Sequence, residues 1–103
     1  MMKRHDRPTG ARWARSTAWT ELLISTDKFT QAEILFNWRT DKIRKDHGLG
    51  PDDDLTVEAL IDRKNDEQWQ NAVTDCRYHA QRMQAFAALH AAAMRELAPS
   101  ERG

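Results

Sequence analysis

Cys76 and His79 are the two residues whose types and spacing most directly point to chemistry. On a helix, positions three apart share a face, so a thiolate and an imidazole there can offer two ligands to one zinc ion. A zinc site needs three or four protein ligands, however, and Cys76 is the only cysteine. The other three histidines are scattered, with no spacing that completes the set. We therefore predict no metal site and no cofactor.

The same pair could also act as a nucleophile and its base. No orienting third group or oxyanion-stabilising element accompanies it, and a buried cysteine near a surface histidine is a far commoner reason for this pattern. Acid–base chemistry requires a desolvated carboxylate with a shifted pKa. The candidate aspartates instead lie among charged neighbours at helix-surface positions, where we expect solvated side chains: Asp41, Asp46, Asp62, Asp66 and Asp75. The sequence thus predicts a protein that is not an enzyme.

The first fifteen residues combine basic side chains with one tryptophan: Lys3, Arg4, Arg7, Arg12, Trp13 and Arg15. This composition suits a segment that contacts phosphate and stacks on bases, and it is also typical of a disordered terminus. Pro8-Thr9-Gly10 is a cluster of helix breakers. We therefore expect a flexible basic arm over residues 1–15, followed by a single helical domain over residues 16–103.

A helix-turn-helix motif would be a second route to nucleic acid, with predicted helices over residues 30–46 and 57–64. The second of these helices begins with Val57-Glu58, directly behind three aspartates at positions 52–54. A recognition helix needs polar side chains that approach phosphate, and these acids repel it. Binding to nucleic acid is therefore the alternative, and binding to protein is the main prediction.

The strongest pattern in the chain is a helical run over residues 66–98. Its seam recurs at alternating intervals of four and three: Trp69, Val73, Cys76, Ala80, Met83, Ala87, His90, Met94 and Leu97. No glycine or proline interrupts the run before Pro99. Such a helix is about 50 Å long at the standard rise, whereas a compact chain of this size has a radius of gyration of about 13 Å. The helix should therefore extend beyond its own domain.

A second helix is predicted over residues 30–46. Thr30 and Glu33 form a capping box, Phe29 and Ile34 form its hydrophobic staple, and Gly48 suits the end of the helix. The apolar residues cover a wide arc, which predicts burial on two sides: Ala32, Ile34, Leu35, Phe36, Trp38 and Ile43. This helix spans about 24 Å. It cannot cover the whole seam. Either a second copy, another subunit or the N-terminal segment covers the remainder, or the long helix is broken.

Two shorter elements complete the prediction. Residues 17–25 favour a short helix or an extended segment, and residues 57–64 favour a helix that Thr56 caps. Asn65 or Asp66 then caps the long helix, or the two helices run together with a kink. The expected fold is all-α: a helical hairpin or a small three- to four-helix arrangement with one long C-terminal helix and a basic N-terminal arm.

Composition supports a helical protein without a strong charge bias. The chain has 103 residues, a net charge of zero and 31% charged residues, so no overall charge draws it to nucleic acid or membrane. A single cysteine favours a reducing, cytoplasmic compartment, and no apolar run approaches the length of a membrane span. Frequent alanine, arginine and aspartate are typical of a GC-rich bacterial or phage source.

These features predict a small non-enzymatic interaction or assembly protein, either a homo-oligomer or an accessory subunit of a larger complex. The alternatives are a nucleic-acid-binding regulator that uses the basic arm and an accessory subunit of a multisubunit enzyme. Tryptophan and arginine are common anchors of protein interfaces. The predicted partner-binding residues are Trp13, Trp19, Arg12, Arg15, Met83, Phe86, Leu89, Ala93 and Leu97.

Overall fold

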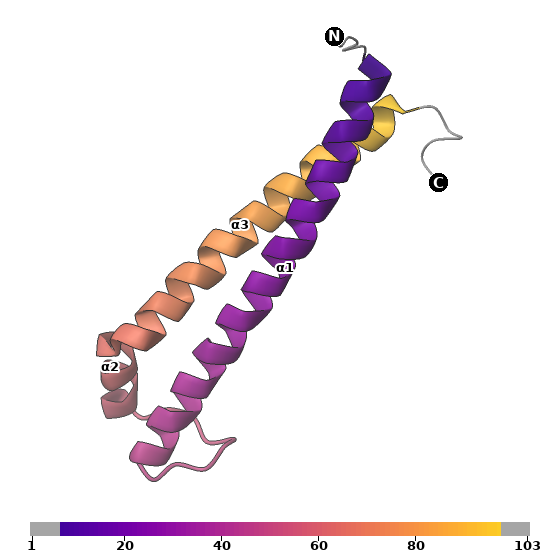
Figure 1. Ribbon diagram of the computed structural model, residues 1–103. Coiled ribbons are helices and arrows are strands. Elements are labelled where there is room, and N and C mark those ends of the chain that lie inside the picture. Colours follow the sequence, from indigo (N-terminus) through magenta and orange to yellow (C-terminus); the bar gives the residue numbers. More distant parts are fainter. Residues whose placement is uncertain (1–6, 98–103) are drawn as a thin grey trace. The chain divides into compact units, whose positions relative to one another are not determined.

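The computed structural model describes residues 7–97, which form three helices (Figure 1). Helix α1 spans Arg7–Asp46, α2 spans Val57–Asn65 and α3 spans Glu67–Glu96. No strand occurs between residues 7 and 97. The all-α class and the long last helix are therefore confirmed, and Pro99, the predicted stop, lies outside the described residues.

Helix α1 is 40 residues long, far longer than predicted. Pro8 lies in its first turn, where the missing N–H has no helical partner to lose. The predicted Thr30 capping box lies in the middle of α1, and no helix begins there. Packing along a neighbouring helix stabilises a helix more than a local cap does, and this explains why residues 25–30 continue without a break.

The predicted basic arm corresponds only in part to described residues. Residues 7–15 form the start of α1, whereas residues 1–6 lie outside the described range. The flexibility of residues 1–15 and the single domain over residues 16–103 stay predictions.

Helix α1 ends at the predicted glycine. Gly48 has a φ of 70°, in the left-handed region that side chains with a Cβ rarely adopt. The Leu49 N–H then donates to the Arg44 carbonyl at 2.9 Å, which closes the last turn of the helix. The turn continues with Asp53, whose Oδ2 accepts from the Gly50 N–H at 2.7 Å.

Both helix caps predicted after the turn are confirmed. Thr56 is the N-cap of α2, and its Oγ1 accepts a hydrogen bond from the Ala59 N–H at 3.2 Å. Asp66 has extended backbone angles between α2 and α3, and its Oδ2 accepts from the Trp69 N–H at 2.8 Å. The two helices are therefore separate, and Asp66 is the residue that starts α3.

The chain divides into two compact units, each of which contains part of α1 and part of α3. In unit 1 (Met1–Asp27 and Ala80–Gly103), Arg82 Nη2 donates to Glu21 Oε1 at 3.2 Å. The Trp19 and His90 rings in that unit lie 5.4 Å apart. The N-terminal segment therefore packs on the late part of α3, which is one of the coverings that the sequence left open.

Unit 2 (Lys28–His79) contains the rest of α1, all of α2 and the start of α3. The Phe36 and Trp69 rings meet there with centroids 5.5 Å apart. Ile43 is buried on the same side of α1, and Ala59 and Ala72 are buried on α2 and α3. In this unit α1 therefore packs against both of the other helices through one side only.

The buried residues of α1 are mostly small. Four of them recur at every seventh position: Ala11, Ala18, Ser25 and Ala32. Among the described residues, Ser25 is the largest side chain that is fully buried. Small side chains let helix backbones approach closely, so this small-residue seam sets the spacing of α1 and α3 within each unit.

The buried face of α3 is rotated slightly from the predicted seam. Trp69, Cys76, Met83 and His90 are half-buried and Leu97 is buried, as predicted. Of the intervening positions, Val73, Ala80 and Met94 are half-buried and Ala87 is exposed. Ala72 and Ala93, each beside a predicted seam position, are buried. Residues spaced three and four apart share one face of a helix. Which edge of that face is buried depends on the position of the neighbouring helix.

Enlarging one seam residue should destabilise the fold. Ala18→Leu adds three carbon atoms at a buried position, and we expect the free energy of unfolding to fall by about 1–3 kcal/mol in urea titrations. Ala88→Leu, at an exposed position of α3, is the control and should change it by less than about 0.5 kcal/mol. Equal stability of the two variants would contradict the small-residue seam.

Candidate interaction surface

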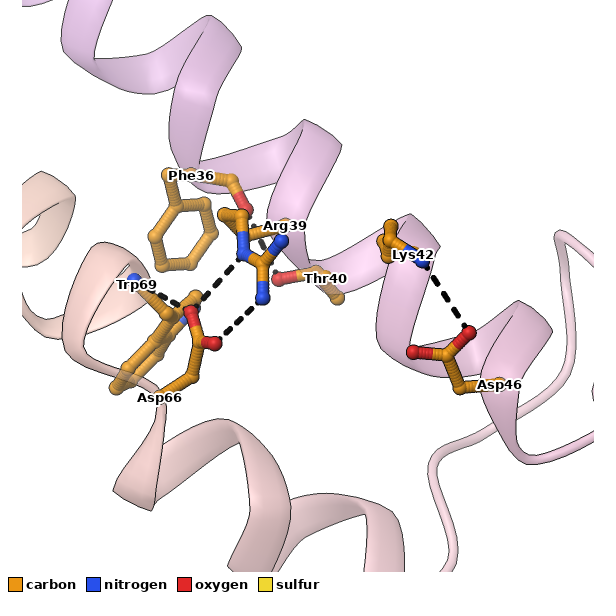
Figure 2. Close-up of polar contacts among 7 residues, drawn as sticks. All are labelled: Phe36, Arg39, Thr40, Lys42, Asp46, Asp66 and Trp69. Carbon is orange, nitrogen blue, oxygen red and sulfur yellow. Dashed lines mark hydrogen bonds and ion pairs between the residues drawn. The ribbon is translucent and has the colours of Figure 1, made fainter.

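A bidentate ion pair connects α1 to the start of α3 (Figure 2). Arg39 Nε donates to Asp66 Oδ2 at 3.0 Å, and Arg39 Nη2 donates to Asp66 Oδ1 at 2.5 Å. The two side chains are only 17% and 19% exposed. Because Asp66 also caps α3, one carboxylate holds α1, the helix junction and the first turn of α3 together.

The ion pair shifts the protonation of both partners. Its hydrogen bond to Arg39 is the largest cause that lowers the pKa of Asp66 below the usual 3.8, and the Trp69 N–H contributes in the same direction. The same hydrogen bond raises the pKa of Arg39. Both groups are therefore charged throughout the neutral range, as a bidentate pair requires.

Aromatic contacts surround this ion pair. Trp69 packs against Phe36 and lies 4.8 Å from the Arg63 guanidinium, within the range of a cation–π contact. On the other side, the Arg39 guanidinium lies 5.4 Å from the centre of the Trp38 ring. Arg39 thus connects the interior of unit 2 with a tryptophan that is 52% exposed.

Trp38 belongs to an exposed side of α1, which we call the outer face. It comprises Lys28, Gln31, Ile34, Leu35, Trp38 and Asp41, all exposed. Ile34, Trp38 and Asp41 lie on the side of α1 opposite Phe36 and Ile43. Lys28 and Leu35 lie at the edge next to α3, where they line a hollow together with His79. Ile34 is 63% exposed, so the prediction that this helix is buried on two sides is wrong for the chain alone. Within unit 2 the other helices cover one side of α1 and leave the second side to solvent.

Two hollows of about 440 Å³ each flank the outer face. The first hollow is lined by Lys28, Gln31, Ala32, Leu35, Asp75 and His79. The second hollow is lined by Trp38, Asp41, Arg44, Lys45, Leu49 and Pro51. Residues of the outer face therefore line both hollows. This side of unit 2 is thus both hollowed and apolar.

Of the cysteine and histidine that suggested chemistry, His79 lines the first hollow and Cys76 does not. Cys76 is half-buried, and burial raises the pKa of its thiol, with Glu33 and Asp75 adding to the effect. A raised pKa leaves less thiolate for nucleophilic attack or metal binding. His79 Nδ1 is buried without a hydrogen-bond partner. Among residues 7–97, no group of three or more histidine, cysteine or acidic side chains is placed to hold a metal ion.

Three of the five aspartates considered for acid–base chemistry make surface contacts. Asp41 accepts from Arg44 at 2.8 Å, Asp46 accepts from Lys42 at 3.4 Å (Figure 2), and Asp62 lies 2.6 Å from His47. All three side chains remain at least 60% exposed. The expectation of a solvated surface is wrong for Asp66, which is partly buried because it serves as both a cap and an ion-pair partner.

All of the predicted partner-binding residues lie in unit 1. Trp13, Trp19 and Leu89 are exposed, as is Arg12, whereas Arg15 is half-buried. Met83 and Phe86 are half-buried, and Ala93 and Leu97 are buried within the unit. The partner-binding role of this set stays a prediction.

Sequence reasoning missed the exposed apolar residues of unit 2. These are Ile34, Leu35 and Trp38 on α1 and Val57, Leu60 and Ile61 on α2. The wide apolar arc of residues 30–46 is the signal for the first group, but an apolar arc does not distinguish burial inside the chain from exposure on its surface.

Comparison of the chain with protein-family models, curated proteins and solved structures finds no match. None of the three helices, within residues 7–97, has the length and apolar character needed to cross a bilayer.

Two substitutions of Asp66 separate its roles. Asparagine caps helices about as well as aspartate, so Asp66→Asn removes the charge and keeps the cap. Asp66→Ala removes both, and its free energy of unfolding should be about 1 kcal/mol lower than that of Asp66→Asn. Urea unfolding at pH 7 measures the difference. Equal stability of the two variants would show that the cap contributes nothing.

The ion pair also predicts a pH dependence. Because the folded-state pKa of Asp66 is lower than the usual 3.8, its contribution to stability is fully present above pH 3.8. That contribution is lost as the pH falls through the lower, folded-state pKa. The stability difference between wild type and Asp66→Asn should therefore shrink in urea titrations from pH 5 to pH 2. A constant difference over this range would contradict the assignment.

Proposed function

We propose that this chain is a small non-enzymatic assembly protein that binds another protein through the outer face of α1. The observation that supports the proposal is the distribution of large apolar side chains. In the described part of the chain, Ile43 and Leu97 are the only large aliphatic or aromatic side chains that are buried, whereas twelve large apolar side chains are exposed. Large exposed apolar patches in soluble proteins usually mark interaction sites.

The outer face has the composition of an interface anchor. It combines a tryptophan with two aliphatic side chains, and Trp is among the most enriched residues at binding hot spots. Completing the burial of these half-exposed side chains contributes about 1 kcal/mol each, or about 3 kcal/mol together. Association costs at least about 4 kcal/mol in lost motional freedom. The three side chains therefore act as the centre of a larger contact to which the flanking polar residues and hollows contribute.

Trp13, Trp19 and Leu89 give unit 1 an apolar surface of its own. An accessory subunit of a larger complex, including a multisubunit enzyme, would use such a second surface to contact a second chain. A nucleic-acid-binding regulator would instead use Arg12 and Arg15. Binding through phosphate contacts weakens steeply as salt rises, whereas apolar association does not. Salt dependence therefore distinguishes these functions.

The proposal predicts that the outer face controls the size of the protein in solution. We expect labelled wild-type protein to sediment faster than a monomer when it is mixed with unlabelled protein or with extract of its source cells. Ile34→Ser combined with Trp38→Ser should abolish the faster species, because both side chains are exposed anchors.

Val57→Ser is the matched control, since it removes an equally exposed apolar side chain from α2. It should leave the faster species in place. The proposal is wrong if the faster species persists when Ile34 and Trp38 are both replaced by serine. It is also wrong if Val57→Ser removes the faster species to the same degree.

A further inference from the structure

A third hollow, of about 330 Å³, lies where the end of α2 meets the first half of α3 in unit 2. It is lined by Lys64 from the last turn of α2 and by five residues of α3: Trp69, Gln70, Val73, Thr74 and Arg77. We infer that this hollow binds a phosphate group. The inference goes beyond the proposed function, because none of these residues belongs to the outer face of α1.

The lining of the third hollow carries two positive charges and no negative charge. Lys64 and Arg77 supply the positive charges, and the other four lining residues are neutral. The first two hollows differ in this respect, because Asp75 lines the first and Asp41 lines the second. An anion in the third hollow therefore meets two cations without repulsion from a carboxylate of the lining.

The two cations of the third hollow are not neutralised within the described part of the chain. Neither Lys64 nor Arg77 forms an ion pair with another residue in the range 7–97. Asp62 and Asp66, each two positions from Lys64, are already paired with other basic side chains. Glu67 is exposed and does not line the hollow. The helix positions three and four residues from Arg77 contain no acid. Both charges thus remain available to an external anion.

The hydrogen-bonding groups of the lining favour a ligand that is rich in acceptors. Lysine and arginine side chains donate hydrogen bonds and accept none. Trp69 adds an indole Nε1–H, also a donor only, which is buried and has no hydrogen-bond partner among the described residues. A phosphate group has several acceptor oxygens and carries close to two negative charges at neutral pH. It therefore matches both the charge and the surplus of donors better than a carboxylate does.

Local contacts hold the two sides of the hollow together. Gln70 Nε2 donates to the Lys64 carbonyl, which ties the end of α2 to the first turns of α3. The Arg63 guanidinium lies 4.8 Å from the centre of the Trp69 ring and connects the same two helices. Neither contact uses the charge of Lys64 or Arg77. The backbone positions of the two cations are therefore set before any ligand binds, and less order has to be imposed on binding.

The affinity should be modest because both cations are exposed. Contacts between exposed charges contribute little individually and are screened by salt. We expect a Kd of about 1 mM for inorganic phosphate at low ionic strength. Val73 and Trp69 form an apolar wall beside the cations, so phenyl phosphate should bind about threefold more tightly than inorganic phosphate.

Titration of the full chain with sodium phosphate at constant ionic strength tests the inference. Two-dimensional NMR should show saturable shifts of the amide signals of residues 64–77 and of one indole N–H signal, which Trp69→Phe identifies by its loss. Lys64→Gln and Arg77→Gln should each raise the Kd about fivefold, and the double variant should raise it at least about twentyfold. Glutamine has nearly the same helix propensity as lysine and arginine, and circular dichroism checks that each variant remains helical.

Lys28→Gln is the matched control, because it removes the same charge from an exposed position in the first hollow. It should change the Kd for phosphate by less than about twofold. The inference is overturned if wild-type signals do not shift saturably, or if Lys28→Gln weakens binding as much as Arg77→Gln does. Acetate at the same ionic strength should bind at least about fivefold more weakly than phosphate, and equal binding would overturn the assignment to phosphate.

The two phosphate probes distinguish the possible sources of the group. Tighter binding of phenyl phosphate, lost in the Lys64→Gln and Arg77→Gln double variant, supports the inference and identifies a phosphorylated organic molecule as the ligand. Binding of inorganic phosphate alone, lost in the same variant, supports the inference and identifies free phosphate.

Discussion

Close packing of α1 against α3 through small side chains is the constraint on which the rest of the structure depends. Alanine and serine occupy every seventh position along the buried side of α1 from Ala11 to Ala32. Within each unit this seam brings the two helices together and leaves little volume for large side chains between them. Most of the large apolar residues therefore lie outside the seam, and several are exposed.

The bidentate ion pair of unit 2 joins α1 to the junction between α2 and α3. Asp66 accepts from Arg39 and from the Trp69 N–H, so it acts as an ion-pair partner and a helix cap at once. Arg39 in turn lies over Trp38. This contact joins the exposed tryptophan to the junction, and a side chain that is already held in place loses less entropy when it is buried.

Features that depend on neighbouring residues were predictable from the sequence. Thr56 and Asp66 cap their helices, and Gly48 ends α1, because a hydroxyl, a carboxylate or a missing Cβ acts within a few residues. The continuity of α1 through Thr30 was not predictable, since packing on α3 overrides a local capping signal. Burial of Asp66 was missed for a similar reason, because its partner Arg39 lies 27 positions away in the chain.

The outer face shows how one pattern supports two interpretations. Ile34, Leu35 and Trp38 indicate burial in the sequence, whereas the chain by itself leaves them exposed. Both observations agree if burial requires another molecule. A sequence can encode a buried face without containing the surface that buries it.

The most direct measurement of this claim is the sedimentation of labelled protein that is mixed with unlabelled protein or with extract of its source cells. If another molecule buries the outer face, the wild-type protein sediments faster than a monomer, and Ile34→Ser combined with Trp38→Ser removes the faster species. A faster species that these substitutions leave unchanged would contradict the account.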